Sequence, residues 1–371
     1  MLTLIHALVA GGDCIDDAEV LRTGSTAAVL GHRVMAPSTL GTFLRSFTFG
    51  HVRQLDRVAE TIMGRAWAAG AGPSDGPMTI DLDSTICEVH GHHKGGAAYG
   101  YTRVLGYHPL LATRADTGEV LHARQRTGRA ASGRGAERFV NEVAGRVRRA
   151  GANGQLVLRA DAGFWSAKVL AACRRHDIHF SITVRQTSTV TAAIAAIGED
   201  AWTDIDYPDG GMAQAAETTL GGDRLIVRRT RLVGPQATGV AGLALPRLHH
   251  RPPGQRRLAR RRPSPPRRLR AGHPRSQRRC GLRHCPSGVF LANAAWLVIA
   301  TLADNLLGWV ATIGLGRADL MAKTLRRRLL HLPGRLTRSA RRRLLHLPTD
   351  WPWATQFLGA LTRLRAIPLP T

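Results

Sequence analysis

The stretch MTIDLDSTI (78–86) alternates apolar and polar residues with the period of two that is typical of a β-strand. Successive side chains of a strand point to opposite faces, so Ile80 and Leu82 project from one face and Asp81 and Asp83 from the other. Two carboxylates on the face opposite the core repel each other, and a divalent cation would relieve that repulsion. This strand therefore predicts a metal site on a β-sheet.

A second strand, QLVLRADAG (155–163), ends at Asp161 before a sharp Ala-Gly exit. A carboxylate at the carboxyl end of a strand, followed by a turn and a helix, is a common catalytic position in α/β sheets. Two alternatives to the metal site stay open. Residues 83–85 could form a plain turn, and Asp161 could be only a helix N-cap.

The chain around these strands predicts a mixed α/β fold. A Gly/Pro linker over 69–77 follows a helical region over 1–70, and Asp116, Thr117 and Gly118 form a turn between two strands. Further strands are expected over 104–114, 119–127, 179–186 and 224–233, and further helices over 135–150, 166–176, 189–197 and 288–315. The order of three strands followed by helix, strand, helix and strand indicates a sheet with an antiparallel half.

The positive charge of the chain is concentrated in one segment. Lys and Arg number 52 and Asp and Glu 26, which gives a formal net charge of +26. Residues 236–280 hold 13 Arg, seven Pro and no Lys, Asp or Glu, so they carry +13. Such a composition buries little apolar area, and we expect this segment to be the least ordered part of the chain. An arginine-rich nucleic-acid arm is the functional alternative.

A second basic block contains the octamer RRRLLHLP twice, at 326–333 and 341–348. Its interleaved apolar residues predict two short amphipathic helices that end at Pro333 and Pro348.

Composition excludes several classes of protein. The five Cys form no CxxC motif, so a disulfide framework or zinc ribbon is not expected. Cys87, His90, His92 and His93 match no standard zinc spacing. The longest apolar stretch, 290–303, is shorter than the roughly 20 residues of a membrane span. We expect a basic cytosolic protein with a polyanionic partner and no membrane.

Longer strings in the chain resemble one known family. TIDLDSTICEVHG, GAAYGYTRVLGYHPLLATRADTGEVLHAR, RADAGFWS and CPSGVFLANAAWLVIATLADNLLGWVATIGL are similar to the insertion-sequence transposases of the DDE type, specifically the 1380 family related to the IS4 group. The resemblance covers about 20–235 and 281–371. The chain begins within what resembles the second part of the family's amino-terminal region, which suggests a missing upstream segment.

The resemblance implies a ribonuclease-H-like catalytic core with three acidic residues around two Mg²⁺ ions, for which Mn²⁺ can substitute. Asp83 matches the first acid in an Asp-x-Thr word, with Asp81 in reserve, and Asp161 matches the second in Asp-x-Gly. The family carries a β-rich insertion between the second and third acids, which we place around 190–260. The implied reaction is DNA strand cleavage and strand transfer.

The third acid is where the chain departs from the family. The resemblance places a Glu in a helix reading like ELAIRDLK, directly before the word that stands intact at 281–288. Here RAGHPRSQRRC precedes that word, and Glu217 is the last Glu of the chain. Asp304 lies in an apolar helix, where a structural role is expected. As written, the chain is therefore expected to be unable to cleave DNA.

Our hypothesis is that a pair of compensating frameshifts, near 236–242 and near 280–281, accounts for this loss. Codons for Arg270 to Cys280 can be chosen so that a shift of one base reads Glu-Leu-Ala-Ile-Arg-Asp-Leu-Lys-Asp-Gly. The same offset over 242–256 gives Asp-Trp-Arg-Tyr-His-Ala-Phe-Ile-Thr-Asp-Arg-Pro-Gly-Asn, which is a plausible strand pair. The codons were selected with the motif in view, so the match shows compatibility and the nucleotide sequence decides.

These expectations divide the chain into a helical DNA-binding region (1–70), the catalytic core with the start of the insertion (78–235), the arginine segment (236–280), and helices that complete the core and end in a basic tail (281–371). The expected partner is double-stranded DNA, both the element's terminal repeats and its target, bound by a possible homodimer in the nucleoid of a bacterial cytoplasm. Candidate DNA contacts are Lys94, Arg103, Arg185, Arg228, Arg229 and the block 326–343. The alternatives are a non-catalytic remnant that binds element ends, and an unstable relic.

Overall fold

The computed structural model describes residues 1–91, 93–100, 102–205, 212–231, 247–250, 284–340 and 342–368, with only the backbone described for 247–250. Within this part of the chain the main sheet has nine strands in the order β6-β5-β1-β7-β8-β12-β11-β10-β9. Their bounds are Val120–Arg124 (β6), Leu110–Arg114 (β5), Met78–Ser84 (β1), Leu156–Ala160 (β7), Ile178–Thr183 (β8), Arg247–His250 (β12), Asp223–Arg231 (β11), Met212–Leu220 (β10) and Thr203–Ile205 (β9).

The sheet is mixed, as the order of elements along the chain predicts. β1 lies at the boundary, because it pairs antiparallel with β5 and parallel with β7. β7 and β8 are also parallel, whereas the strands from β12 to β9 pair antiparallel. The strands β9 to β12 occupy the stretch where a β-rich insertion is expected, and β12 joins them to β8.

The stretch 104–114 is not one strand, which corrects the expectation from its sequence. β4 (Leu105–Tyr107) belongs to a separate three-stranded sheet with β2 (Cys87–Glu88) and β3 (Ala98–Tyr99), and β5 begins only at Leu110. The break falls at Pro109, whose nitrogen carries no hydrogen to donate to a sheet.

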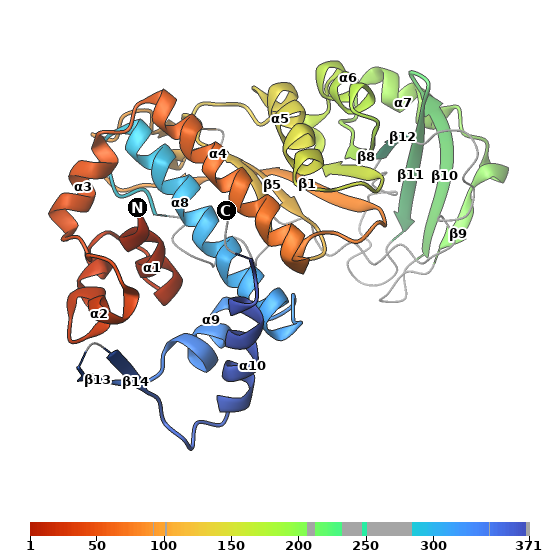
Figure 1. Ribbon diagram of the computed structural model, residues 1–371. Helices are drawn as coiled ribbons and strands as arrows, with labels where there is room; N and C mark the ends of the chain where they lie inside the picture. The colour runs from red at the N-terminus through yellow and green to blue at the C-terminus, as the bar shows by residue number, and fades with distance from the viewer. Residues whose placement is uncertain are drawn as a thin grey trace.

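The strands at the centre of the sheet bury alternate residues. Met78, Ile80 and Leu82 of β1 are buried and the residues between them are half-buried; β7 and β8 repeat the pattern. Two predicted helices, α5 (Ala136–Arg149) and α6 (Ala167–Arg175), contribute their apolar stripes to the same core. In Figure 1 these helices lie along one side of the sheet. The opposite face, which carries Asp81 and Asp83, is the more open one.

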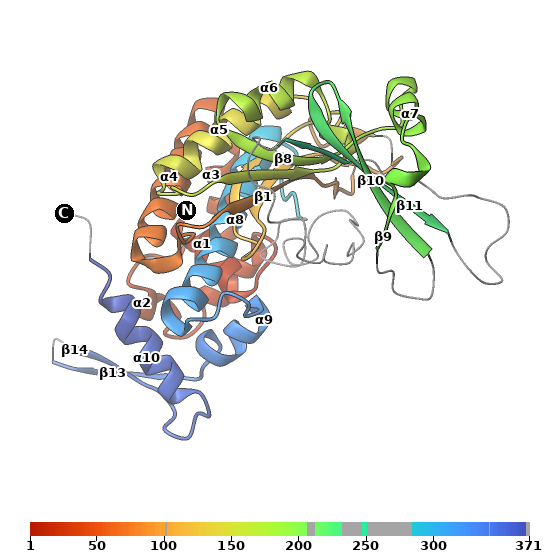
Figure 2. The same ribbon diagram turned by 90° about the vertical axis from the view of Figure 1, so that its right-hand side faces the viewer.

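Helices from both ends of the chain pack together beside β6. The predicted helical region contains α1 (Leu2–Ala10), α2 (Thr26–Leu30), α3 (Pro37–Arg45) and α4 (Phe49–Ala66). The expected long helix is present as α8 (Phe290–Trp309), which continues as a π-helical turn to Gly314. α8 contacts α1, α3, α4 and β6, and Figures 1 and 2 both show it among the three helices.

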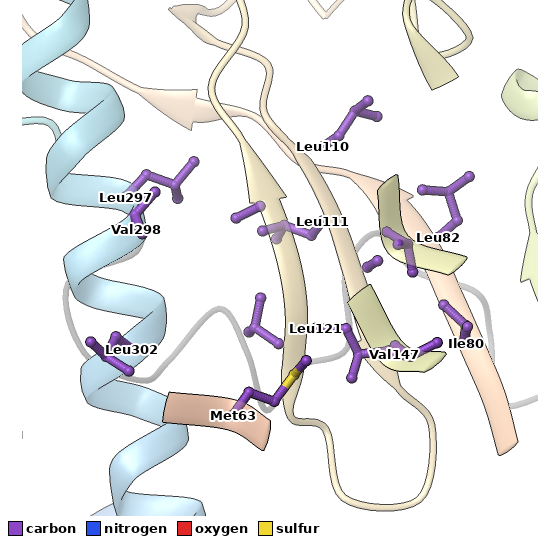
Figure 3. Close-up of a cluster of buried hydrophobic side chains, with 14 of the residues drawn as sticks. Met63, Ile80, Leu82, Leu110, Leu111, Leu121, Val147, Leu297, Val298 and Leu302 are labelled. Carbon is purple, nitrogen blue, oxygen red and sulfur yellow. The ribbon is translucent and has the colours of Figure 1, made fainter. Parts of the chain in front are cut away.

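One cluster of apolar side chains joins these layers. Figure 3 shows Met63 of α4, Leu121 of β6 and Leu302 of α8 gathered beside Ile80 of β1 and Val147 of α5. All five side chains are buried. Because segments more than 200 residues apart share this core, the terminal helices and the sheet form one packed unit.

α8 is long and apolar enough to cross a membrane by length and composition. The segment Phe290–Gly314 has a mean hydropathy of 1.5, and 72% of its most apolar window is buried inside the protein. A buried core helix satisfies the same criteria, and α8 fits that description through its contacts with β6 and α4.

The two copies of RRRLLHLP adopt different structures, so the prediction of two helices is wrong for the second copy. The first copy forms a π-helical turn (Arg326–Leu330) after α9 (Ala322–Leu325). The second forms β14 (Arg342–His346), which pairs with β13 (Arg335–Ser339) before the final helix α10 (Ala354–Arg365). Tertiary contacts override local propensity here. The Arg326 side chain donates to the carbonyls of Leu8 and Val9 at the end of α1, which anchors the first copy.

The arginine segment 236–280 lies outside the described residues except for β12, so the expectation of low order there is not tested. The remaining predicted helix, over 189–197, is present as α7 (Ser188–Ala195).

Candidate active site

The two central parallel strands, β1 and β7, bring Asp83 and Asp161 together at their carboxyl ends. We call this end of the two strands the edge of the site. The last register pair between β1 and β7 is Leu82 with Ala160, and each Asp follows that pair by one residue. Neighbouring strands lie about 4.8 Å apart, and register partners in parallel strands point to the same face. The structure therefore places the two predicted acids as neighbours on the more open face.

Asp81 lies on the same face but is committed to an ion pair. Its two carboxylate oxygens accept from Nε and Nη2 of Arg159 at 2.6 and 2.7 Å. Arg159 is its register partner on β7, so the pair is held by the sheet itself. Of the two Asp in β1, Asp83 is thus the one at the edge, beside Asp161, and Asp81 neutralises an arginine.

Backbone hydrogen bonds orient both edge carboxylates. Oδ1 of Asp83 accepts from the N–H of Ser84 at 2.7 Å, and Oδ1 of Asp161 accepts from the N–H of Gly163 at 2.8 Å. The second bond is an N-cap of the short turn that follows β7, so the N-cap alternative for Asp161 holds as well. A cap and a ligand role are compatible, because a cap uses one of the two oxygens.

A glycine is required after Asp161 by a close approach of two loops. A Cβ at Gly163 would lie 2.8 Å from Cβ of Ser132 and 3.0 Å from Oδ1 of Asp161. Ser132 also exchanges a hydrogen bond with the hydroxyl of Ser84 at 3.2 Å. The Asp-x-Gly word thus lets the loop that carries Ser132 close against both strand ends.

Arg126 holds that loop in place. Its Nη1 donates to the carbonyls of Ala131, Ser132 and Arg134 at 2.9, 3.0 and 2.8 Å, and its Nε donates to the carbonyl of His108 at 2.8 Å. Burial, with a smaller contribution from the charge of Arg134, lowers the pKa of Arg126 to about 10. This pKa still leaves the guanidinium charged at neutral pH.

His108 is the buried titratable group of this edge. It is 2% exposed, and its Nδ1 lies 2.7 Å from the carbonyl oxygen of Ala130. Burial lowers the pKa of His108, and the negative charge of Asp161 acts in the opposite direction. The imidazole is therefore neutral at physiological pH and lies within the electrostatic reach of Asp161.

No third carboxylate accompanies Asp83 and Asp161 among the described residues. The one three-residue group there with ligand atoms close enough for a metal is Asp13, Cys14 and Asp17, in the amino-terminal helical region. That group is exposed or half-buried, and the oxygen Oδ2 of Asp17 is occupied by the backbone N–H groups of the other two residues.

Asp304 is buried and lies at the other end of the sheet. It is 2% exposed and lines a small cavity with Thr117 and Glu119, in the turn between β5 and β6. Since β5 runs antiparallel to β1, that turn lies at the amino end of β1. Asp304 therefore lies away from the end of the sheet that carries Asp83 and Asp161, and its structural role stays a prediction.

The chain matches the family model described as transposase DDE domain group 1, over residues 1–219 and 275–369. The chain is a DDE transposase. Members of this family cut DNA strands and join the cut ends to new DNA, and they use divalent metal ions. No curated protein matches the sequence.

The solved structures similar to this transposase include a cryo-EM structure of the piggyBac transposase synaptic complex with hairpin DNA. The match has a TM-score of 0.45 at 13% sequence identity, and it covers 87% of this chain and 68% of that one.

The basic residues predicted to contact DNA are dispersed through the transposase. Arg103 and Arg185 are exposed, whereas Nζ of Lys94 donates to the carbonyl of Cys285. Arg229 donates to Glu199 at 2.8 and 2.6 Å and lies over the ring of Trp202, and Arg228 is half-buried. Arg229 is therefore already neutralised in the described structure, which makes it the weakest of these candidates.

The sequence did not single out His108, Ser84, Ser132 or Arg126. Ser84 is adjacent to Asp83, so its position was available from the strand pattern. His108 and Ser132 reach the edge through a strand break and a loop, which no periodicity marks. Nothing in the sequence distinguishes Arg126 from the other arginines. Its role in holding the loop is seen only from its hydrogen bonds to four backbone carbonyls in the structure.

The donor chemistry at this edge fits part of a metal site. Carboxylate oxygens are the ligands that Mg²⁺ and Mn²⁺ prefer. Asp83 and Asp161 supply them on one face, but a two-ion site needs a further acid that the described residues do not provide.

Proposed function

We propose that this transposase belongs to the 1380 family of bacterial insertion sequences, related to the IS4 group, and that its sheet is a ribonuclease-H-like core. The observation that carries the proposal is the placement of Asp83 and Asp161 one residue beyond a register pair of parallel strands. Two carboxylates on one open face, each oriented by a backbone N–H, are suited to hold a divalent cation.

The residues of this edge have distinct proposed roles. Asp83 and Asp161 would hold two Mg²⁺ ions together with a third acid, and the ions would stabilise the attacking and leaving oxygens of a phosphoryl displacement. Asp81 fixes Arg159, and the Ser84–Ser132 contact fixes the loop beside Asp161. Neutral His108 adds no positive charge to the cation-binding face.

We propose further that the chain is catalytically defective because its third acid was lost to two compensating frameshifts. The family match is interrupted between residues 219 and 275, which overlaps the arginine segment 236–280. The family match resumes at residue 275, five residues before the proposed return to frame at 280–281. The position of the second frameshift is therefore less well supported than that of the first. A stop codon in the shifted frame, or the lack of a Glu codon there, would refute the frameshift.

The proposed partner is double-stranded DNA, bound at the ends of the element by a homodimer in the bacterial cytoplasm. The remaining positive charge outside 236–280, +13 of the +26, supports a polyanionic partner. The alternative function is a remnant that binds element ends without cutting, and the lack of a third acid in the described residues favours it for the chain as written.

Two assays on the intact chain separate these functions. Gel-shift titration with a terminal-repeat duplex measures binding, and a supercoiled plasmid carrying the repeats reports Mg²⁺-dependent nicking. Binding with nicking indicates an active enzyme, binding alone a remnant, and neither a relic. Nicking by the chain as written would contradict the proposed defect.

Restoring the reading frame across 236–280 tests the cause. The restored protein should nick, and Asp83→Asn or Asp161→Asn should abolish nicking without loss of DNA binding. Asp81→Asn is the matched control, because it removes a carboxylate from the same face but from an ion pair. Equal losses in all three variants would contradict the assignment of Asp83 over Asp81.

A further inference from the structure

The β13–β14 hairpin is an exposed ribbon of arginines. Every residue of β14 is exposed, and Leu344 and Leu345 are 49% and 45% exposed. Figures 1 and 2 show the hairpin beside the helical part of the molecule and apart from the main sheet. An isolated two-stranded ribbon is only marginally stable in water, so a surface of this kind gains from a partner.

The register of the hairpin sorts its side chains onto two faces. Residues opposite each other in an antiparallel pair share a face, and alternate residues point away. Arg338 and Arg343 are partners on one face, and Nη1 of Arg343 donates to the carbonyl of Ala28 in α2 at 3.3 Å. That face contacts the helical body through Arg343, and its residues Arg338, Arg343 and Leu345 are otherwise exposed.

The other face, which we call the open face, carries guanidinium, hydroxyl and imidazole groups and one leucine. It consists of Arg335, Thr337, Ser339, Arg342, Leu344 and His346. The Thr337 hydroxyl lies 2.8 Å from Nε2 of His346, a contact between the two strands on this face. Two guanidinium groups at opposite ends, with hydroxyl and imidazole groups between them, suit an extended polar partner.

The charge of the surrounding segment favours a polyanion over a second copy of the chain. Residues 320–349 contain nine Lys and Arg and no Asp or Glu. Across the described residues, no carboxylate forms an ion pair with an arginine of the hairpin. Two copies meeting at this surface would bring like charges together, whereas a phosphate backbone would neutralise them.

We propose that the open face of the β13–β14 hairpin seats a DNA duplex, with the ribbon lying along the major groove and Arg335 and Arg342 on the phosphates. A major groove about 12 Å wide admits a two-stranded β-ribbon. Thr337, Ser339 and His346 then face the groove between the two phosphate contacts. This inference rests on the proposed function only for the identity of the partner as DNA.

The test is the salt dependence of DNA binding by the full chain. Fluorescence anisotropy with a 30-base-pair duplex over a KCl series gives the slope of log K against log [KCl]. Arg335→Gln with Arg342→Gln should reduce the magnitude of that slope by about 2, since each lost phosphate contact removes about 0.9. Affinity near 0.1 M KCl should fall about tenfold or more. Circular dichroism and thermal melting should be unchanged.

Two control pairs carry the same loss of charge. Arg57→Gln with Arg138→Gln removes two arginines that are 69% and 71% exposed on α4 and α5. After the substitutions, Glu60 still forms an ion pair with Arg149, and Glu142 still forms one with Arg124. Arg338→Gln with Arg343→Gln alters the face that contacts the helical body. Both controls should leave the slope within about 0.5 of the parent value, a margin well below one phosphate contact.

The possible results lead to distinct conclusions. Equal slopes for the open-face pair and the controls would overturn the hairpin inference and leave the proposed function standing. A dimer in sedimentation that dissociates only in the open-face variant would replace DNA by a second copy. If the unaltered chain binds no duplex at any salt concentration, both the hairpin inference and the DNA-binding role fail.

Discussion

At the scale of single residues, the two acidic side chains of β1 have different environments. Asp81 is bound by Arg159, and Asp83 reaches the edge where β7 ends at Asp161. Sequence alone placed both on one face and left the choice between them open. The choice follows from the register with β7, which brings an arginine opposite one Asp and an acid opposite the other.

Mn²⁺ binding provides a readout of this difference that does not depend on activity. Asp83→Asn and Asp161→Asn should each weaken Mn²⁺ binding by tenfold or more, on the order of 1.4 kcal/mol, because each removes a hard oxygen donor. Asp81→Asn should leave binding within about twofold and lower stability by no more than about 1 kcal/mol, because the ion pair with Arg159, whose side chain is 43% exposed, is partly screened by solvent. Electron paramagnetic resonance of free Mn²⁺ measures the first quantity and urea unfolding the second. A weaker site in the Asp81 variant alone would reverse the assignment.

Glu119 makes stability depend on pH in an unusual direction. Its carboxylate accepts from the indole N–H groups of Trp67 and Trp309, and burial raises its pKa from 4.5 to about 7. An acid with a raised pKa binds more protons in the folded state, so its contribution to stability falls as pH rises from about 4.5 to about 7.

Glu119→Gln should remove the loss of stability that accompanies ionisation of Glu119, because glutamine resembles the protonated, neutral carboxyl group and does not ionise. The stability of the variant relative to the parent should rise by about 3 kcal/mol between pH 4.5 and 7.5 and stay level above that. Urea unfolding of both proteins at several pH values measures this difference, in which the pH dependence of all other titratable groups cancels because the two proteins share them. A flat difference would mean that Glu119 is already ionised in the folded protein.

At the scale of elements, the repeated octamer shows the limit of sequence patterns. Alternation predicted β1 and β7 correctly because one face of each strand is buried, and helical spacing predicted α4, α5 and α8 for the same reason. RRRLLHLP has one sequence and two structures, so its conformation is set by what each copy contacts. The strand break at Pro109 and the loop held by Arg126 likewise depend on contacts that no local pattern contains.

The same position in the two copies gives a matched pair of substitutions. Leu329 is 5% exposed in the first copy, and Leu344, its equivalent, is 49% exposed in the second. Leu329→Ala should cost about 2–4 kcal/mol of unfolding free energy, because it leaves a cavity against α1 and α9, whereas Leu344→Ala should cost less than about 0.5 kcal/mol. Equal costs, measured by urea unfolding, would mean that the hairpin leucine is buried by an intramolecular contact.

At the scale of the whole molecule, α8 joins the carboxyl-terminal part to the edge of the sheet. The side chain of Asn305 donates to the carbonyl of Val120 and accepts from its N–H, both at 2.8 Å. It thereby satisfies the backbone of β6, which is an edge strand. The helix thus closes the sheet on the side away from β9.

Asn305→Ala should destabilise the entire protein and not α8 alone. The substitution leaves a buried N–H and carbonyl without partners, which costs about 2–4 kcal/mol. Unfolding followed by tryptophan fluorescence and by far-ultraviolet circular dichroism should shift together, since the terminal helices share one core with the sheet. Asn141→Ala, at a half-buried site on α5, is the control and should shift the midpoint much less. Separate transitions in the Asn305 variant would show that the helical layer unfolds independently.

The four-residue strand β12 connects β8, and through it β7 and β1, to β9, β10 and β11, and it comes from the segment proposed to be out of frame. The hydrogen bonds between strands join backbone N–H and C=O groups. Every residue except proline supplies both groups, whatever the reading frame. In the shifted frame the same four codons would read Ala-Phe-Ile-Thr, which is also good strand sequence. Because peptide groups hold the sheet together at this point, a change of reading frame there would alter the side chains of β12 and leave the pairing of its main chain possible.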